Sequence, residues 1–389
     1  LLAGTGVWWA LGRTAPPRSP LLERAAYYAS IGQRDDNERA IVLYRQRLQE
    51  APDDRAAQVG LSRVLSARAC LFAGDAADLE RAQALADRVI TVDPRDAGAH
   101  AALAYSFDCR GRIDDALREY ERAVALDGDA DASRASAAYL YERRGRLADA
   151  LAANLAVRDP SRVPFLGIQI ATNPDLLGYA AAAEARYRES FQLYPDNVFS
   201  NLAWPSFLMR HGRDAEARAA LAEARSRGTD HTSLQLLAAE LAQLAGDRDA
   251  AREAVSRAIA FRPRASFPRT VAWWREEVRP PATTLRAQAE SLRAGMRNGS
   301  EPLDGLDAAL LLDAAGDRDA ALAALMDAVD AGYRDSAYLR ASPLFAPMRE
   351  APGFAAILAR VDRAVARERD LVRTRGLERQ AGITAPAAP

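Results

Sequence analysis

Small and large apolar residues recur along the chain in a fixed order, separated by short polar stretches that carry a glycine. The stretches "RGRIDDALREYERAVALDG" and "RGRLADALAANLAVRDP" begin with the same three residues, and their glycines, Gly111 and Gly145, lie 34 residues apart. Gly212 and Gly246 have the same separation. A fixed period in this range is typical of repeated helix pairs. The pattern therefore predicts tandem antiparallel helices along most of the chain.

Each position in a predicted pair has a physical role. In residues 97–130, the expected second helix carries Ala116, Tyr120 and Ala123. The alanines let neighbouring helices approach closely, and the tyrosine fills the space beside them. Gly111 is expected to take the left-handed backbone conformation that ends the first helix. Two later units repeat this order of small, large and turn residues.

Nine such units cover the chain almost without gaps. Their expected boundaries are 21–54, 55–96, 97–130, 131–163, 164–197, 198–231, 232–265, 266–301 and 302–335. The second unit has extra residues around its turn, and the eighth has two prolines in place of the turn glycine. Pro174 and Pro205 are expected to kink or shorten the first helices of their units.

The order of these residues resembles the tetratricopeptide repeat (TPR) family. The resemblance implies an all-α fold, a right-handed α-solenoid of about nine antiparallel helix pairs. Residues 336–367 resemble the end segment of bacterial repeat regions fused to signalling domains, and they are expected to form helices that cap the last apolar face. Residues 368–389 are polar and then rich in Ala and Pro, so we expect a fraying helix and a disordered tail there.

The resemblance also implies a binding surface, because the first helices of TPR pairs line a concave groove that holds a peptide or a partner helix. Carried over to this chain, the groove candidates are Tyr105, Asp108, Tyr139, Glu142, Phe165, Ile168, Phe199, Leu202, Met209, Glu240 and Gln243. The alternative is that several of them only pack between neighbouring helices. One TPR subtype clamps a partner's C-terminal carboxylate with Lys and Asn, and this chain has no Lys, so we do not expect that mode.

Composition narrows the function further. The net charge is −1, whereas nucleic-acid binders usually have a strongly basic domain or face. We therefore expect a protein or peptide partner and no direct nucleic-acid binding. The sequence has no His-Glu-x-x-His, no Gly-x-Ser-x-Gly and no Walker loop, and the histidines His100, His211 and His231 match no metal spacing. These observations predict no catalysis, no cofactor and no metal.

The two cysteines are expected on the same edge of the solenoid, one repeat apart. Cys70 lies in the extended turn of the second unit, and Cys109 ends the first helix of the third. A disulfide is geometrically conceivable, and two independent thiols are the other interpretation.

Residues 1–20 form an apolar segment and a linker. Twelve helical residues would span about 18 Å, against about 30 Å for the hydrocarbon core of a bilayer, so the segment is compatible with part of a membrane helix. A short buried or frayed helix is the alternative. Arg13 and the "TAPPRSP" that follows are typical of a hinge outside a span.

Together these features favour a non-catalytic scaffold. The chain resembles the sensory or scaffolding part of a bacterial regulator anchored in the inner membrane. If the missing effector domain is cytoplasmic, we expect the solenoid in the periplasm. The alternative is a cytoplasmic solenoid. The second hypothesis is an accessory subunit that delivers substrates to a separate envelope assembly or secretion enzyme. The third is an enzyme with its site in the irregular units 55–96 and 266–301.

Overall fold

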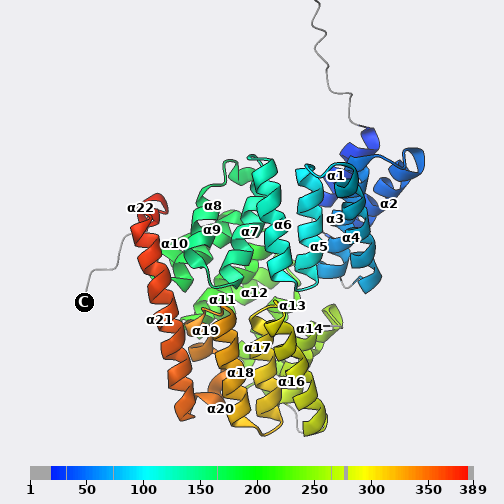
Figure 1. The fold of residues 1–389 in the computed structure, drawn as a ribbon. Coiled ribbons are helices and arrows are strands. Elements are labelled where there is room, and N and C mark those ends of the chain that lie inside the picture. The colour runs from blue at the N-terminus through cyan, green and yellow to red at the C-terminus, as the bar shows by residue number, and fades with distance from the viewer. Residues whose placement is uncertain are drawn as a thin grey trace, which may run out of the picture.

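The computed structural model describes residues 19–383, apart from 32, 73, 164, 264 and 276–278. Within these described residues, the regular elements are all helices and no strand occurs. Most of the helices follow one another as antiparallel pairs joined by short turns. The prediction of an all-α solenoid of helix pairs is therefore confirmed (Figure 1).

The pairs have the following bounds in the described part of the chain. They are α1 (Pro20–Ile31) with α2 (Arg34–Glu50), α3 (Arg55–Leu71) with α4 (Ala76–Val92), α5 (Ala97–Cys109) with α6 (Ile113–Leu126), α7 (Asp131–Arg143) with α8 (Leu147–Leu155), and α9 (Leu166–Leu176) with α10 (Ala180–Leu193). They continue with α11 (Val198–Arg210) and α12 (Asp214–Ser226), α13 (Thr232–Leu244) and α14 (Arg248–Phe261), α15 (Ser266–Arg275) and α16 (Ala282–Arg297), and α17 (Leu303–Ala314) and α18 (Arg318–Ala331). A short 3₁₀ helix, η1 (Pro160–Arg162), precedes α9.

The turn glycines have the conformation that the sequence predicts. Gly111 has a φ of 72° and Gly145 a φ of 68°, both in the left-handed region. The amide of Arg112, just after Gly111, donates to the carbonyl of Phe107 at 2.9 Å and so satisfies an orphan acceptor at the end of α5. The alanines at the helix crossings, such as Ala116 and Ala123, are fully buried.

Two local irregularities differ from expectation. Most of the extra residues of the second unit lengthen its helices instead of its turn: α3 and α4 have 17 residues each, against 13 in α5 and 14 in α6. Pro174 lies in the last turn of α9, which has 11 residues, but Pro205 lies inside α11 without shortening it below 13. Of the two expected effects, kinking or shortening, Pro205 therefore does not produce the second.

The cysteines are joined. Cys70, near the end of α3, and Cys109, at the end of α5, form a disulfide, with their Cα atoms 5.2 Å apart. The longer α3 brings Cys70 level with the end of the next first helix. The disulfide thus ties the second unit to the third.

The solenoid turns back on itself. Figure 1 shows the pairs from α1 to α10 in one layer and those from α15 to α18 in a second layer beneath it, with α11 and α12 between the layers. Arg144, in the turn after α7, donates to the carbonyl oxygens of Gly299 at 2.8 Å and Ser300 at 3.0 Å, which lie between α16 and α17. The amide of Ile113 donates to the same Gly299 carbonyl at 3.3 Å. Residues far apart in the sequence therefore close the superhelix.

The C-terminal segment covers the end of the array. It contains α19 (Ser336–Ala341), the 3₁₀ helix η2 (Pro343–Phe345), α20 (Ala346–Arg349), α21 (Pro352–Thr374) and α22 (Leu377–Gln380). Phe345 and Phe354 are buried in the largest hydrophobic core, as a cap requires. Helix α21 packs against α18 of the lower layer and α8 of the upper one (Figure 1).

The expectation of a fraying helix beyond residue 367 is wrong for residues 368–383. Val372, Leu377 and Ile383 are buried in one cluster with apolar residues of α8. Tyr179 donates its hydroxyl to Glu378 at 2.5 Å. The segment is ordered because it covers apolar surface that α8 would otherwise expose. The expected tail at 384–389 lies outside the described residues.

The apolar segment at residues 1–18 also lies outside the described residues. Among the helices that are described, none combines the length and the apolar character that a membrane span requires.

Candidate interaction surface

The first part of the predicted groove lies where the two layers meet. Tyr105 and Asp108 come from α5, and Tyr139 and Glu142 come from α7. Arg143 lies among them; its guanidinium pairs with Glu301 of the lower layer and donates to the Tyr139 hydroxyl at 2.5 Å. All four groove candidates are partly buried, and Asp108 and Tyr139 lie near Glu301 of the lower layer.

Burial raises the pKa values of two carboxyl groups in this region. Burial, with a further contribution from the Glu301 carboxylate, raises the pKa of Asp108 to about 6, although Arg143 opposes the shift. Burial also raises the pKa of Glu142 to about 7 against the opposing charges of Arg143 and Arg210. Asn173 donates its side-chain amide to Glu142 at 2.7 Å. The Asp108 carboxyl thus lies near Glu301 of the lower layer, whereas the Glu142 carboxyl is held by Asn173 of α9 in its own layer.

The chain's own C-terminal segment covers a second part of the predicted groove. Met209 is 2% exposed and Glu240 is 5% exposed. Glu240 accepts hydrogen bonds from the Tyr338 hydroxyl at 3.0 Å and the Ser342 hydroxyl at 2.5 Å. Burial raises the pKa of Glu240 to about 7, and these hydrogen bonds oppose the rise. Met209 and Glu240 therefore do not line an open groove, which corrects the sequence-based placement.

Ion pairs also join the helices around Met209 and Glu240. Arg210 pairs with Asp175 at 2.6 Å and with Asp335 at 2.8 Å, so α11 is joined both to α9 and to the segment before α19. The last groove candidate, Gln243, is partly buried near the end of α13.

The remaining candidates form an accessible aromatic patch, which consists of Phe165, Ile168, Phe199 and Leu202. Phe165 and Phe199 pack edge to face, with ring centroids 6.1 Å apart. Phe199 is 49% exposed, while Ile168 and Leu202 pack partly against the main core. The patch thus has a fixed base and an exposed rim. Exposed apolar surface of this kind is typical of protein contact sites.

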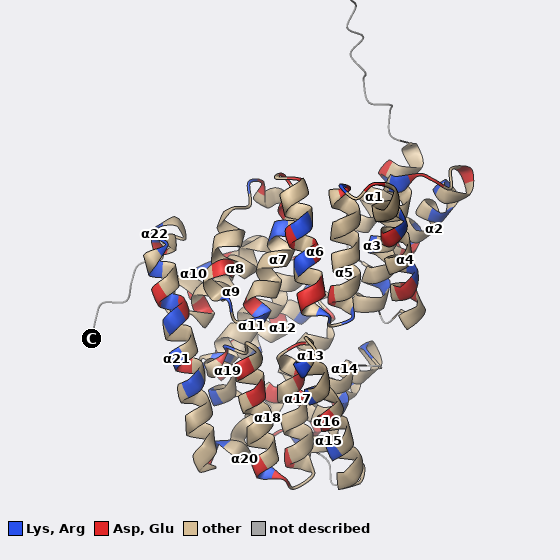
Figure 2. Ribbon diagram, in the orientation of Figure 1, with Lys and Arg blue, Asp and Glu red and all other residues tan. Residues whose placement is uncertain are grey.

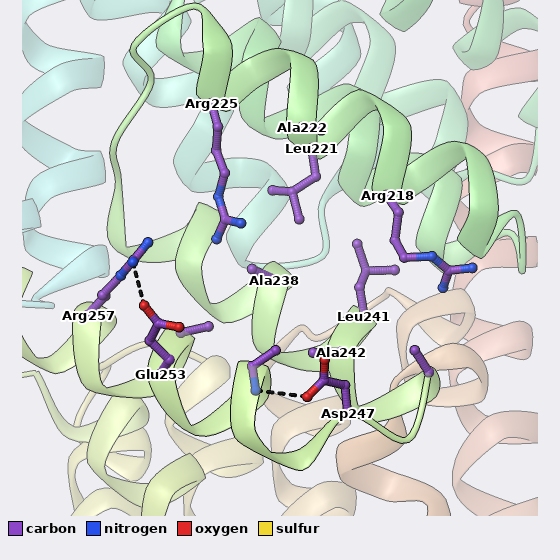
Figure 3. A pocket seen from close by; sticks show the side chains of 13 residues that line it. Arg218, Leu221, Ala222, Arg225, Ala238, Leu241, Ala242, Asp247, Glu253 and Arg257 are labelled. Carbon is purple, nitrogen blue, oxygen red and sulfur yellow. Dashed lines mark hydrogen bonds and ion pairs between the residues drawn. The ribbon is translucent and has the colours of Figure 1, made fainter.

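A groove on the other side of the solenoid was not predicted. It has a volume of about 340 Å³ and lies between α12, α13 and α14; we call it the α12–α14 groove (Figure 3). Its lining includes Arg218, Leu221 and Arg225 of α12, Leu241 of α13 and Arg257 of α14. The sequence signal was the seven-residue spacing of Arg218 and Arg225, which places both on one helix face.

The histidines serve local structure. His100 hydrogen bonds with Glu119 at 2.6 Å, and His211 with Asp175 at 2.8 Å. The His231 side chain accepts from the amide of Ser233 at 3.1 Å and caps α13. The described part of the chain contains no group of three or more His, Cys, Asp or Glu side chains that could hold a metal ion.

Charged residues of both signs are interspersed over the helices of both layers (Figure 2). Two ion pairs link the second-helix side of one unit to that of the next. Arg293 of α16 and Asp327 of α18 are 2.6 Å apart, and Arg213, just before α12, lies 2.6 Å from Glu184 of α10. Ion pairs between successive units therefore help to stack the solenoid.

Solved structures of other proteins have a similar arrangement of helix pairs. The crystal structure of the APC/C hetero-tetramer Cut9–Hcn1 is similar with a TM-score of 0.51 and 12% sequence identity, over 88% of this chain and 55% of that chain. The fold is a TPR-like α-solenoid. A tetratricopeptide repeat protein from Parabacteroides merdae ATCC 43184 is similar over 62% of this chain and 91% of that chain, with a TM-score of 0.48 and 12% identity.

PilW, described as a widely conserved type IV pilus biogenesis factor, gives a TM-score of 0.43 at 19% identity, over 55% of this chain and 98% of that chain. No protein-family model matches the sequence, and no curated protein matches it. At these identities the likeness concerns the fold of the TPR-like solenoid and not its partners.

Proposed function

We propose that this TPR-like solenoid is a non-catalytic scaffold that binds a segment of a partner protein over the aromatic patch. The observation that carries the proposal is the exposure of Phe199 beside the packed apolar residues Ile168 and Leu202. Aromatic residues are enriched at protein interfaces because they bury a large area with few rotatable bonds.

The test is partner capture from the native host with a matched pair of variants. Phe199→Ala should lower the recovery of a specifically bound protein several-fold, because it removes the exposed ring of the patch. The control is Val92→Ala, since Val92 is 73% exposed at the end of α4 and outside the patch. Circular dichroism would show that both variants fold.

A photo-crosslinking side chain at residue 202 should label the same partner, and Phe165→Ala should reduce that labelling. Equal recovery with Phe199→Ala and Val92→Ala would contradict the proposed surface.

We further propose that the chain is the sensory or scaffolding part of a membrane-anchored bacterial regulator, with the solenoid in the periplasm. The Cys70–Cys109 disulfide supports an oxidising compartment, because disulfides are rare in the reducing cytosol. In intact cells quenched with acid, both cysteines should resist alkylation until a reductant is added. Immediate alkylation of both thiols would contradict a periplasmic solenoid.

The same compartment would suit the alternative, an accessory subunit for an envelope assembly or secretion enzyme. The captured partner distinguishes the two: a signalling effector favours the regulator, and an assembly or secretion enzyme favours the accessory subunit.

A further inference from the structure

The α12–α14 groove lies on the face of α13 that points away from the concave side. Glu240 of α13 contacts the C-terminal segment, whereas Leu241 of the same helix lines the groove. Figure 3 shows Leu221 and Leu241 directed into the space between α12 and α14, with short alanine side chains around them. The groove is therefore separate from the aromatic patch, and it has an apolar floor that a backbone can approach closely.

The rim of this groove has unbalanced positive charge. Arg218 is exposed and has no hydrogen bond or ion pair among the described residues. Arg225 donates to the neutral side-chain oxygen of Gln235 at 2.9 Å. Of the two acidic residues in the lining, Glu253 already pairs with Arg257, and Asp247 caps the amide of Ala250 at 3.0 Å. Among the described residues, neither Arg218 nor Arg225 forms an ion pair with a carboxylate, although Asp230 and Glu253 lie near Arg225.

One later pair of second helices differs in this respect, because Arg293 and Asp327 join α16 to α18 at 2.6 Å. Within the described residues, no ion pair is found between α12 and α14. Burial, and then the nearby Arg257 charge, lower the pKa of Arg225, while the carboxylates of Asp230 and Glu253 oppose the shift.

We propose that the α12–α14 groove binds an acidic amphipathic helix of a partner protein. The carboxylates of that helix would pair with Arg218 and Arg225, and its small apolar residues would lie on the alanines between Leu221 and Leu241. The two arginines are seven residues apart, which corresponds to about 10.5 Å along one face of α12. Asp or Glu residues seven apart on a helix lying alongside would match this spacing.

Residues 1–18 and 384–389 contain no Asp or Glu, so these two segments do not provide the carboxylates. We assign the occupant to a segment of another protein, and its binding does not depend on the aromatic patch.

The test uses the full chain and synthetic helical peptides of about five turns. One peptide carries two Glu residues seven apart with Ala and Leu between them on the same face; a second carries Gln in place of Glu, and a third carries Lys. Fluorescence anisotropy should show that the Glu peptide binds at least about fivefold more tightly than the Gln peptide at low salt, with the difference shrinking at high salt. The Lys peptide should bind least.

Three variants separate the groove from general electrostatics. Arg218→Glu should weaken the binding of the Glu peptide by about fivefold or more. Ala222→Trp, at an exposed lining position, should block binding of the peptide sterically. Arg122→Glu is the matched control, because Arg122 is also exposed on a second helix, α6, and forms no ion pair among the described residues. That variant should leave the affinity unchanged.

Equal affinity for the Glu and Gln peptides would overturn the proposal. Equal losses from Arg218→Glu and Arg122→Glu would do the same. Displacement of the Glu peptide by free glutarate at matching concentrations would show a site for small anions and would also contradict a helix site. Phe199→Ala should not change the affinity for the Glu peptide. A negative result for the α12–α14 groove would therefore leave the proposal for the aromatic patch unaffected.

Discussion

Arg110 and Arg144 occupy the same position of two successive repeats, yet their surroundings differ. Arg110 is exposed at the end of α5, while Arg144 binds two carbonyl oxygens of the lower layer and pairs with Asp114 at 2.8 Å. The sequence predicted both as parts of a turn. It could not predict the second role, because the carbonyls lie more than 150 residues away in the chain.

Gly111 and Gly145 provide a test of the contact between the turn after α7 and the lower layer. Both have a left-handed backbone, so alanine at either position should cost about 1 kcal/mol. A Cβ at residue 111 would meet open space, but at residue 145 it would lie 2.5 Å from the carbonyl oxygen of Gly332. We therefore expect Gly145→Ala to lower the free energy of unfolding by about 2–3 kcal/mol. Urea denaturation of both variants measures the difference, and equal losses would contradict the packed contact.

Glu142 gives a pH-dependent prediction at the same scale. Burial raises its pKa in the folded chain to about 7, so folding is favoured while it is protonated. The contribution of protonated Glu142 to the stability of the fold is complete below the pKa of this residue in the unfolded chain, near 4.5. This contribution is lost as the pH rises through about 7. In Glu142→Gln, the side-chain oxygen can still accept from Asn173.

Between pH 5 and pH 8, the variant should become more stable relative to the wild type, by on the order of 1 kcal/mol. Urea denaturation at both pH values measures this, and a difference that is independent of pH would contradict a raised pKa.

At the scale of elements, the regular pairs could be predicted because their positions recur locally. Leu, Ala and Gly at fixed spacing determine where a first helix packs, ends and reverses. The C-terminal segment has no such period. The sequence indicated a cap up to residue 367, but the burial of Val372 and Leu377 against α8 depends on where the superhelix brings α8.

Neighbouring residues of α21 test whether its end is packed. Val372 is fully buried, and Leu371 is 41% exposed. Val372→Ala should therefore lower the free energy of unfolding by about 2 kcal/mol, through lost burial and a cavity, while Leu371→Ala should change it by less than about 0.5 kcal/mol. Thermal and urea denaturation of the two variants measure this. Equal small effects would restore the view of a fraying helix.

At the scale of the whole molecule, the main difference from expectation is the closure of the concave face. The sequence predicted one open groove, whereas the structure places Asp108 and Tyr139 near Glu301 of the lower layer and covers Glu240 with the C-terminal segment. The curvature of a solenoid is the sum of small rotations between repeats, and no single unit encodes it. That the aromatic patch binds a partner stays a prediction, as does binding in the α12–α14 groove.

The most direct test of this account is the distance between the two layers in solution. Arg110 and Asn298 are exposed at the ends of α5 and α16, close to the hydrogen bond between Ile113 and Gly299. Spin labels on Arg110→Cys/Asn298→Cys, with the native disulfide intact, can be measured by double electron–electron resonance. A closed solenoid predicts one narrow distribution at short distance, and a broad distribution at long distance would show an open groove and contradict the account.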